Sequence, residues 1–131
     1  MSYEDELEKR GFKLDAWVTF GDWEGDYAAI LSKDGQRGFV VIGYGSCSGC
    51  DAWQDVTDCL SESKWSPEIK NEVKALMDSI ENDITWGTNE ELISKVTNSY
   101  PNNGDFNWYR HDDDYKKNID SLVFAIIRGT A

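Results

Sequence analysis

Three cysteines and one histidine are the residues of this sequence best suited to hold a metal ion. Cys47 and Cys50 form a Cys-x-x-Cys pair, Cys59 follows in the next predicted helix, and His111 lies far along the chain. Thiolate and imidazole are preferred zinc ligands, so these four residues are a candidate zinc set, with Asp51 as an alternative fourth ligand. Zinc is the one cofactor that the sequence suggests; the other interpretation is that the chain carries none.

The segment from residue 43 to residue 51 has three further interpretations. A thiol near a helix N-terminus acquires thiolate character, which suits redox chemistry, although Asp51 and Asp55 would oppose that charge. Three glycines and two serines expose backbone N–H groups that could cradle phosphate, but the spacing departs from the dinucleotide fingerprint and no lysine follows. Alternatively, the glycines only permit a tight turn, Ser48 or Asp51 caps a helix, and the cysteines are buried.

The same segment carries the only family resemblance. The run Gly-Tyr-Gly-Ser-Cys-Ser-Gly-Cys-Asp, with its flanks from residue 39 to residue 54, resembles a stretch found in small uncharacterised proteins of bacteriophages and mobile elements. It covers about an eighth of the chain. The resemblance implies a biological setting and brings no activity or catalytic residues with it.

A helix is predicted over residues 51–60, because apolar residues recur there with helical spacing. Four carboxylates share the opposite side, at i, i+4, i+7 and i+11, and no basic residue lies among them: Asp51, Asp55, Asp58 and Glu62. Carboxylates on a rigid helix imitate the charge of a phosphate backbone. We therefore expect this stripe to engage a basic partner protein, such as a host nucleic-acid-processing or defence protein.

Six tryptophans are present, and most should lie in or beside the core of so small a protein. Aromatic residues also dominate the binding energy of protein interfaces. Trp23 and Trp53 lie near the acidic segments, so we expect these two to be exposed and to anchor a partner.

The elements that must position these residues are strands first and helices later. A short helix is predicted over residues 2–10, followed by strands over residues 16–20, 26–32 and 39–45. Asp34 and Gly35 tolerate the positive φ angles of a tight hairpin between the second and third strands. A three-stranded antiparallel meander results.

Capping residues mark the helices of the second half. Ser66 and Pro67 open the clearest helix, and Thr88 with Glu91 forms a capping box for a helix to about residue 97. Turn formers predict a loop over residues 99–105. The apolar spacing from residue 115 to residue 126 favours a last helix, with a strand over residues 122–127 as the alternative.

Length, composition and net charge limit the fold class and the kinds of function that the chain can have. Its 131 residues and 40% hydrophobic content suit one α+β domain spanning residues 1–131, with helices packed on one face of a small sheet. The formal charge of −12 disfavours direct binding of nucleic acid. No signal peptide or membrane span is predicted, and the odd number of cysteines suits a reducing compartment, so we expect a cytoplasmic, non-enzymatic binding protein.

Overall fold

The computed structural model describes residues 3–21, 24–45, 52–57, 60–103 and 114–128, including backbone but not side chains at residues 24, 45 and 98–103. The elements in chain order are α1 (Tyr3–Lys9), β1 (Lys13–Gly21), β2 (Glu24–Lys33), β3 (Gln36–Gly45), α2 (Ala52–Thr57), η1 (Glu62–Lys64), α3 (Pro67–Asn82), β4 (Thr85–Trp86), α4 (Asn89–Asn103) and α5 (Tyr115–Arg128). The predicted α+β class is confirmed.

The strands form one antiparallel sheet in the order β1-β2-β3-β4. The predicted meander is its first three strands, and the predicted hairpin is present, with Asp34 at φ 53° and Gly35 at φ 78° between β2 and β3. Asp and Gly take these left-handed angles more readily than other residues do, which explains the position of the turn. The prediction missed β4, which pairs with β3 through only two residues.

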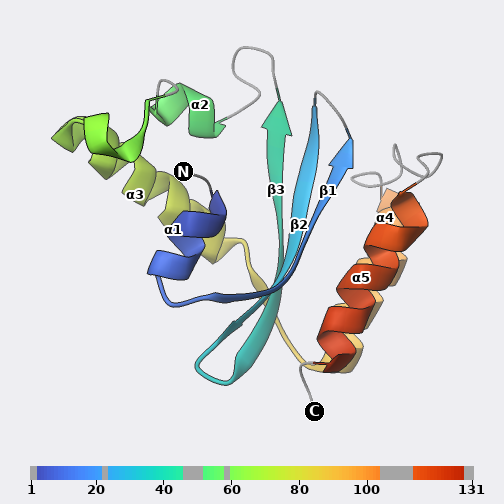
Figure 1. Ribbon diagram of the computed structural model, residues 1–131. Helices are drawn as coiled ribbons and strands as arrows, with labels where there is room; N and C mark the ends of the chain where they lie inside the picture. Colours follow the sequence, from blue (N-terminus) through green and yellow to red (C-terminus); the bar gives the residue numbers. More distant parts are fainter. Residues whose placement is uncertain (1–2, 22–23, 46–51, 58–59, 104–113, 129–131) are drawn as a thin grey trace.

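Helices cover both faces of the sheet, so the prediction that they pack on one face is wrong. Figure 1 shows α1, α2 and α3 on one side of β1 to β3, and α4 and α5 on the other. The physical reason lies in β2, where four consecutive residues are fully buried: Ala28, Ala29, Ile30 and Leu31. Successive side chains of a strand point to opposite faces, so an uninterrupted apolar run needs a cover on each face.

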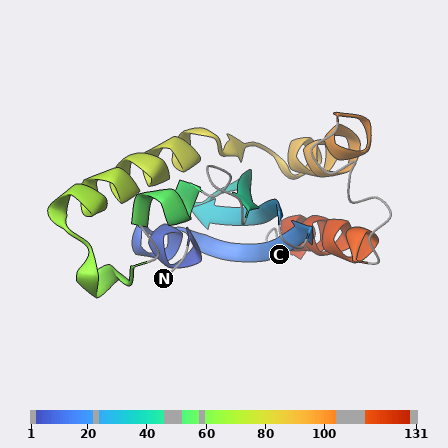
Figure 2. The same ribbon diagram turned by 90° about the horizontal axis from the view of Figure 1, so that it is seen from above.

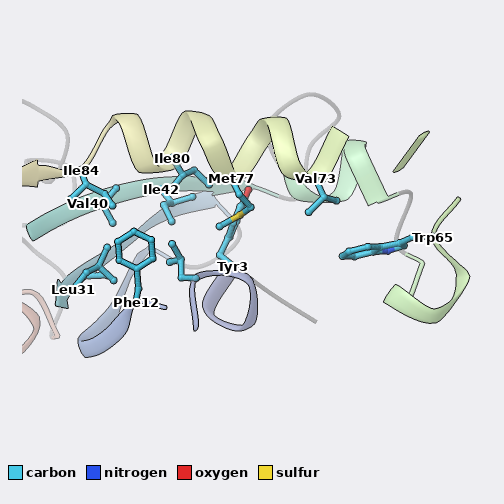
Figure 3. Close-up of a cluster of buried hydrophobic side chains, with 12 residues drawn as sticks. Tyr3, Phe12, Leu31, Val40, Ile42, Trp65, Val73, Met77, Ile80 and Ile84 are labelled. Carbon is cyan, nitrogen blue, oxygen red and sulfur yellow. The ribbon is translucent and has the colours of Figure 1, made fainter. Parts of the chain in front are cut away.

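The first core lies between the sheet and α1 and α3 (Figure 3). Leu31 of β2, Val40 and Ile42 of β3, and Met77 and Ile80 of α3 meet there. The face of α3 that packs on this core buries Val73, Met77 and Ile80, whereas Ile69 and Leu76 beside them are only partly buried.

The second core lies between the opposite face of the sheet and α4 and α5. Its fully buried side chains include Ile30 of β2, Leu92 and Val96 of α4, and Leu122 and Ile126 of α5. The last helix is therefore confirmed, and the alternative of a strand there is wrong. Within the described part of the chain, no helix combines the length and apolar character needed to cross a bilayer.

Capping chemistry sets the starts of α3 and α4 as predicted. The Ser66 hydroxyl accepts a hydrogen bond from the Ile69 N–H at 3.2 Å. In the capping box, the Glu91 N–H donates to the Thr88 hydroxyl and the Thr88 N–H donates to the Glu91 carboxylate. The end of α4 was predicted wrongly, since the helix continues to Asn103 through residues expected to form a loop.

Gly38 allows β3 and β4 to approach closely at the edge where the chain crosses from one face of the sheet to the other. Gly38 pairs with Trp86, and a Cβ atom added to it would lie 2.5 Å from Cγ2 of Ile84. That distance is well inside van der Waals contact. The two-residue strand β4 therefore depends on a glycine at this position.

Candidate functional site

The predicted acidic stripe does not form one helix face among the residues that the structure describes. The helix α2 is described over Ala52–Thr57, residues 60 and 61 are not helical, and Glu62 begins the separate turn η1. The indole N–H of Trp65 donates to the Leu60 carbonyl at 2.9 Å and fixes the chain between them. The predicted helix is therefore confirmed over residues 52–57 but does not continue through Leu60 to Glu62, and Asp55 is exposed on α2 as expected. Asp51 and Asp58 lie outside the described residues.

Glu62 has a basic partner, although no basic residue lies among the four carboxylates in the sequence. Lys9, at the end of α1, forms an ion pair with Glu62 and a second one with Glu6 at 3.1 Å. The hydrogen bond with Glu62 is the main cause of a raised pKa at Lys9. Glu62 therefore shares a cation with Glu6, and this could not be read from spacing because the cation comes from another helix.

Trp53 is partly buried, in contrast to the expected exposed anchor. Its ring lies 5.0 Å from that of Tyr3 and meets the ring of Trp65 edge-on at 5.9 Å. These contacts attach α2 to the first core, because aromatic pairs at such distances add to the energy of burial. The expected exposure of Trp53 is thus corrected, its role in binding a partner stays a prediction, and Trp23 lies outside the described residues.

The candidate zinc set cannot be assembled from the described residues, since Cys47, Cys50, Cys59 and His111 all lie outside them. Within residues 3–21, 24–45, 52–57, 60–103 and 114–128, no group of three or more His, Cys, Asp or Glu side chains is placed to hold a metal ion.

Charge is distributed unequally between the two helical layers. The helices on the first-core side, α1, α2, η1 and α3, contain ten acidic and four basic residues. The helices on the opposite side, α4 and α5, contain three acidic and four basic residues. Figure 2 shows these two layers at opposite ends of the view, separated by the sheet. We call α1, α2, η1 and α3 the acidic layer.

Arg10 neutralises part of the acidic layer where α1 meets α3. Its guanidinium donates to Asp78 at 2.8 Å, to Glu81, and to the carbonyl oxygen of Lys74 at 3.1 Å. The hydrogen bond from Arg10 is the main cause of a lowered pKa at Asp78. This pairing ties the two helices together and leaves other acids of the layer exposed: Asp5, Glu8, Asp55, Glu68 and Glu72.

A second polar cluster, which residue spacing did not predict, joins β1, β2 and β3 to the end of α5. Asp15 accepts hydrogen bonds from the Ser32 hydroxyl and from Nε of Arg37 at 3.4 Å. Arg37 also donates to the Ile126 carbonyl at 3.2 Å. The side chains of Asp15 and Arg37 are only 11% and 14% exposed, so this pair is shielded from water. The one visible signal was a lone acid within the apolar run of β1.

Comparison with known proteins returned no significant similarity: no protein-family model, curated protein or solved structure matches the chain.

Proposed function

We propose that the chain is a non-enzymatic binding protein whose acidic layer engages a basic surface of a partner protein. The observation that carries the proposal is the difference in charge between the described helices on the two faces of the sheet, with ten acids against four bases in the acidic layer and three against four in α4 and α5. If acidity served solubility alone, the two layers would need no such difference.

The partner surface that fits this layer is one that otherwise holds nucleic acid. The helix α3 is 16 residues long and presents Glu68 and Glu72 one turn apart, both exposed. Carboxylates fixed on a rigid helix offer a basic groove the same sign of charge as a phosphate backbone. In the bacteriophage setting suggested by residues 43–51, an inhibitor of a host nucleic-acid-processing or defence protein is the specific form of this proposal.

Two charge-matched variants test the proposal. Immobilised wild-type chain is exposed to bacterial lysate at about 50 mM and about 500 mM salt, alongside Glu68→Lys/Glu72→Lys and Glu90→Lys/Asp120→Lys. All four acids are exposed, and both variants change the net charge equally, but only the first alters the acidic layer. A basic protein retained at low salt by wild type and by the second variant, but not by the first, is the expected result.

Equal loss of binding in both variants would mean that only net charge matters, and binding indifferent to salt would contradict an electrostatic interface. Adding duplex DNA distinguishes the specific form, because DNA should displace the chain from a surface that holds nucleic acid.

The alternative function is a metal-binding or thiol-redox protein centred on Cys47 and Cys50. Elemental analysis of the purified chain and thiol titration of Cys50→Ser separate it from the binding function. Stoichiometric zinc, or a markedly acidic thiol, would favour this alternative.

A further inference from the structure

Strand β1 is an edge of the sheet formed by the described residues, and its outward backbone groups can be assigned. Lys33 and Gln36 flank the two-residue turn and pair directly, so they exchange both hydrogen bonds of that pair. Alternation along β2 then directs the N–H and C=O of Ala28 toward β1, where Ala28 pairs with Val18. The neighbouring residue Trp17 therefore directs its own N–H and C=O to the outer edge.

At each end of this outer edge, a structural feature limits the pairing of a further strand. At one end, the side-chain amide of Asn118 on α5 donates to the Thr19 carbonyl at 2.8 Å. At the other end, the register shifts between Leu14 and Ala16, which is the signature of a β-bulge. Bulges and capped edges limit strand addition. The backbone of Trp17, between these two features, is the centre of the remaining open edge.

A groove of about 540 Å³ runs between this edge and α5. Its wall on β1 is the stretch of residues 13–18, and its wall on α5 is a stripe at i, i+3, i+4 and i+7: Ser121, Phe124, Ala125 and Arg128. Six residues of an extended chain span roughly 17 Å, so the groove is long enough for a short peptide segment, of which the part beside Trp17 can pair with β1. Phe124 is 58% exposed and gives the groove an apolar surface.

The charges of the groove have the opposite sign to that of the whole chain. The side chain of Lys13 is 82% exposed, and the guanidinium of Arg128 lies 5.4 Å from the centre of the Phe124 ring. The acid in the described lining, Asp15, is already bonded to Arg37 and Ser32. Asp15 also lies 3.9 Å from the Lys13 ammonium, so the described lining carries two cations against one acid that Lys13 shares with Arg37, and this net positive charge favours carboxylates.

We propose that this groove binds an extended acidic peptide segment of a partner protein, which adds a strand to β1. The segment would form backbone hydrogen bonds with Trp17, place carboxylates near Lys13 and Arg128, and lay an apolar side chain against Phe124. Strand addition supplies affinity through the backbone, and side-chain pockets supply specificity. This site lies on the layer opposite the acidic one and recognises the opposite charge, so it is independent of the proposed function.

The first test uses a synthetic probe, an N-acetylated peptide of alternating valine and glutamate. Titrated into labelled full-length chain, it should shift the amide resonances of residues 14–18 and 121–128, while α1 and α3 stay unchanged. A peptide with lysine in place of glutamate should bind at least about tenfold more weakly. Equal binding of the two peptides, or no shift in β1 at millimolar peptide, would overturn the proposal.

The second test uses matched variants. Lys13→Glu/Arg128→Glu should weaken the glutamate peptide about tenfold or more, whereas Lys64→Glu/Lys70→Glu, with the same change of net charge on the acidic layer, should not. Trp17→Pro should abolish binding that Trp17→Ala retains, because both lose the ring and only proline loses the outward N–H. Equal effects within either pair would overturn the proposal.

A peptide methylated on its backbone nitrogens tests strand addition without altering the protein, so a poorly folded proline variant does not decide the outcome. Loss of binding on methylation is expected, and unchanged binding would exclude strand pairing. Sedimentation tests whether a second copy of this chain occupies the edge instead of a peptide. A dimer of wild-type chain that the glutamate peptide fails to dissociate would assign the edge to a second copy and overturn the proposal.

Discussion

Lys9 of α1 and Glu62 of η1 lie 53 residues apart in the sequence and form an ion pair. The pair joins the first helix to the segment that follows α2, next to the aromatic contacts among Tyr3, Trp53 and Trp65. Its side chains are 49% and 41% exposed, so water and salt weaken it. It therefore offsets part of the negative charge of the acidic layer, shared between Glu62 and Glu6, without adding much stability.

A double-mutant cycle on Lys9→Ala and Glu62→Ala should give a coupling energy of about 0.2–1 kcal/mol, as for other exposed ion pairs. Urea denaturation of the four proteins measures it. The coupling should shrink at about 1 M salt, because screening is then nearly complete. A coupling that persists unchanged at high salt would show that the two residues interact by something other than charge.

Gly38→Ala should destabilise the protein by about 1–3 kcal/mol, because the new methyl group would meet Ile84 and Trp86 across the β3–β4 pair. The free energy of unfolding from urea titration measures this. Gly35→Ala is a contrasting control, since nothing lies within 4 Å of the added atom and only its positive φ angle is strained. If Gly38→Ala proved neutral, the close approach of β4 would be disproved.

Ser66→Ala should cost about 1 kcal/mol, because the Ile69 N–H loses its acceptor at the start of α3. Ser79→Ala, at an exposed position inside the same helix, should be neutral or stabilise by up to about 0.5 kcal/mol. Thermal denaturation followed by circular dichroism compares the two. Equal effects would show that Ser66 does not act as a cap.

Stability should fall in acid as two depressed carboxyl pKa values are passed. The pKa of Asp78 lies below its ordinary value of 3.8 because of the hydrogen bond from Arg10. The pKa of Glu91 lies below its ordinary value of 4.5 because of the backbone hydrogen bond from Thr88. A carboxyl whose pKa is lower when folded contributes fully above its unfolded pKa, and loses that contribution as the pH falls through its folded pKa.

Denaturation midpoints measured from about pH 6 to about pH 2 should therefore decline once the pH falls below the ordinary carboxyl pKa values. The decline should be less steep in Asp78→Asn and in Glu91→Gln. Glutamine keeps the hydrogen-bonding shape of the capping box and removes only the charge. A pH dependence identical to that of wild type in both variants would contradict the assigned causes.

Local chemistry made much of this fold predictable. Asp34 and Gly35 located the hairpin, and Ser66 and Thr88 located two helix starts, because each depends on neighbours within a few residues. The features that were not predicted depend on contacts between residues far apart in the sequence. The pairing of β4 with Gly38, the placement of α4 and α5 on the second face, and the bond between Lys9 and Glu62 all join segments far apart in the sequence.

The same division holds for the candidate sites. Four carboxylates at helical spacing were visible in the sequence, but the break in the helix at residues 60 and 61 was not, and the burial of Trp53 depends on packing against Tyr3 and Trp65. The groove beside β1 was not visible at all, since its two walls come from opposite ends of the chain.

The burial of β2 on both faces has a consequence for how the chain can be divided. A cut between α3 and α4 would leave the amino-terminal piece with the whole meander but with Ala28 and Ile30 bared to water. The carboxy-terminal piece would keep two helices and no sheet on which to pack. Because each fragment would lack half of the cover of β2, we expect neither to fold alone and the two pieces to regain structure only when mixed.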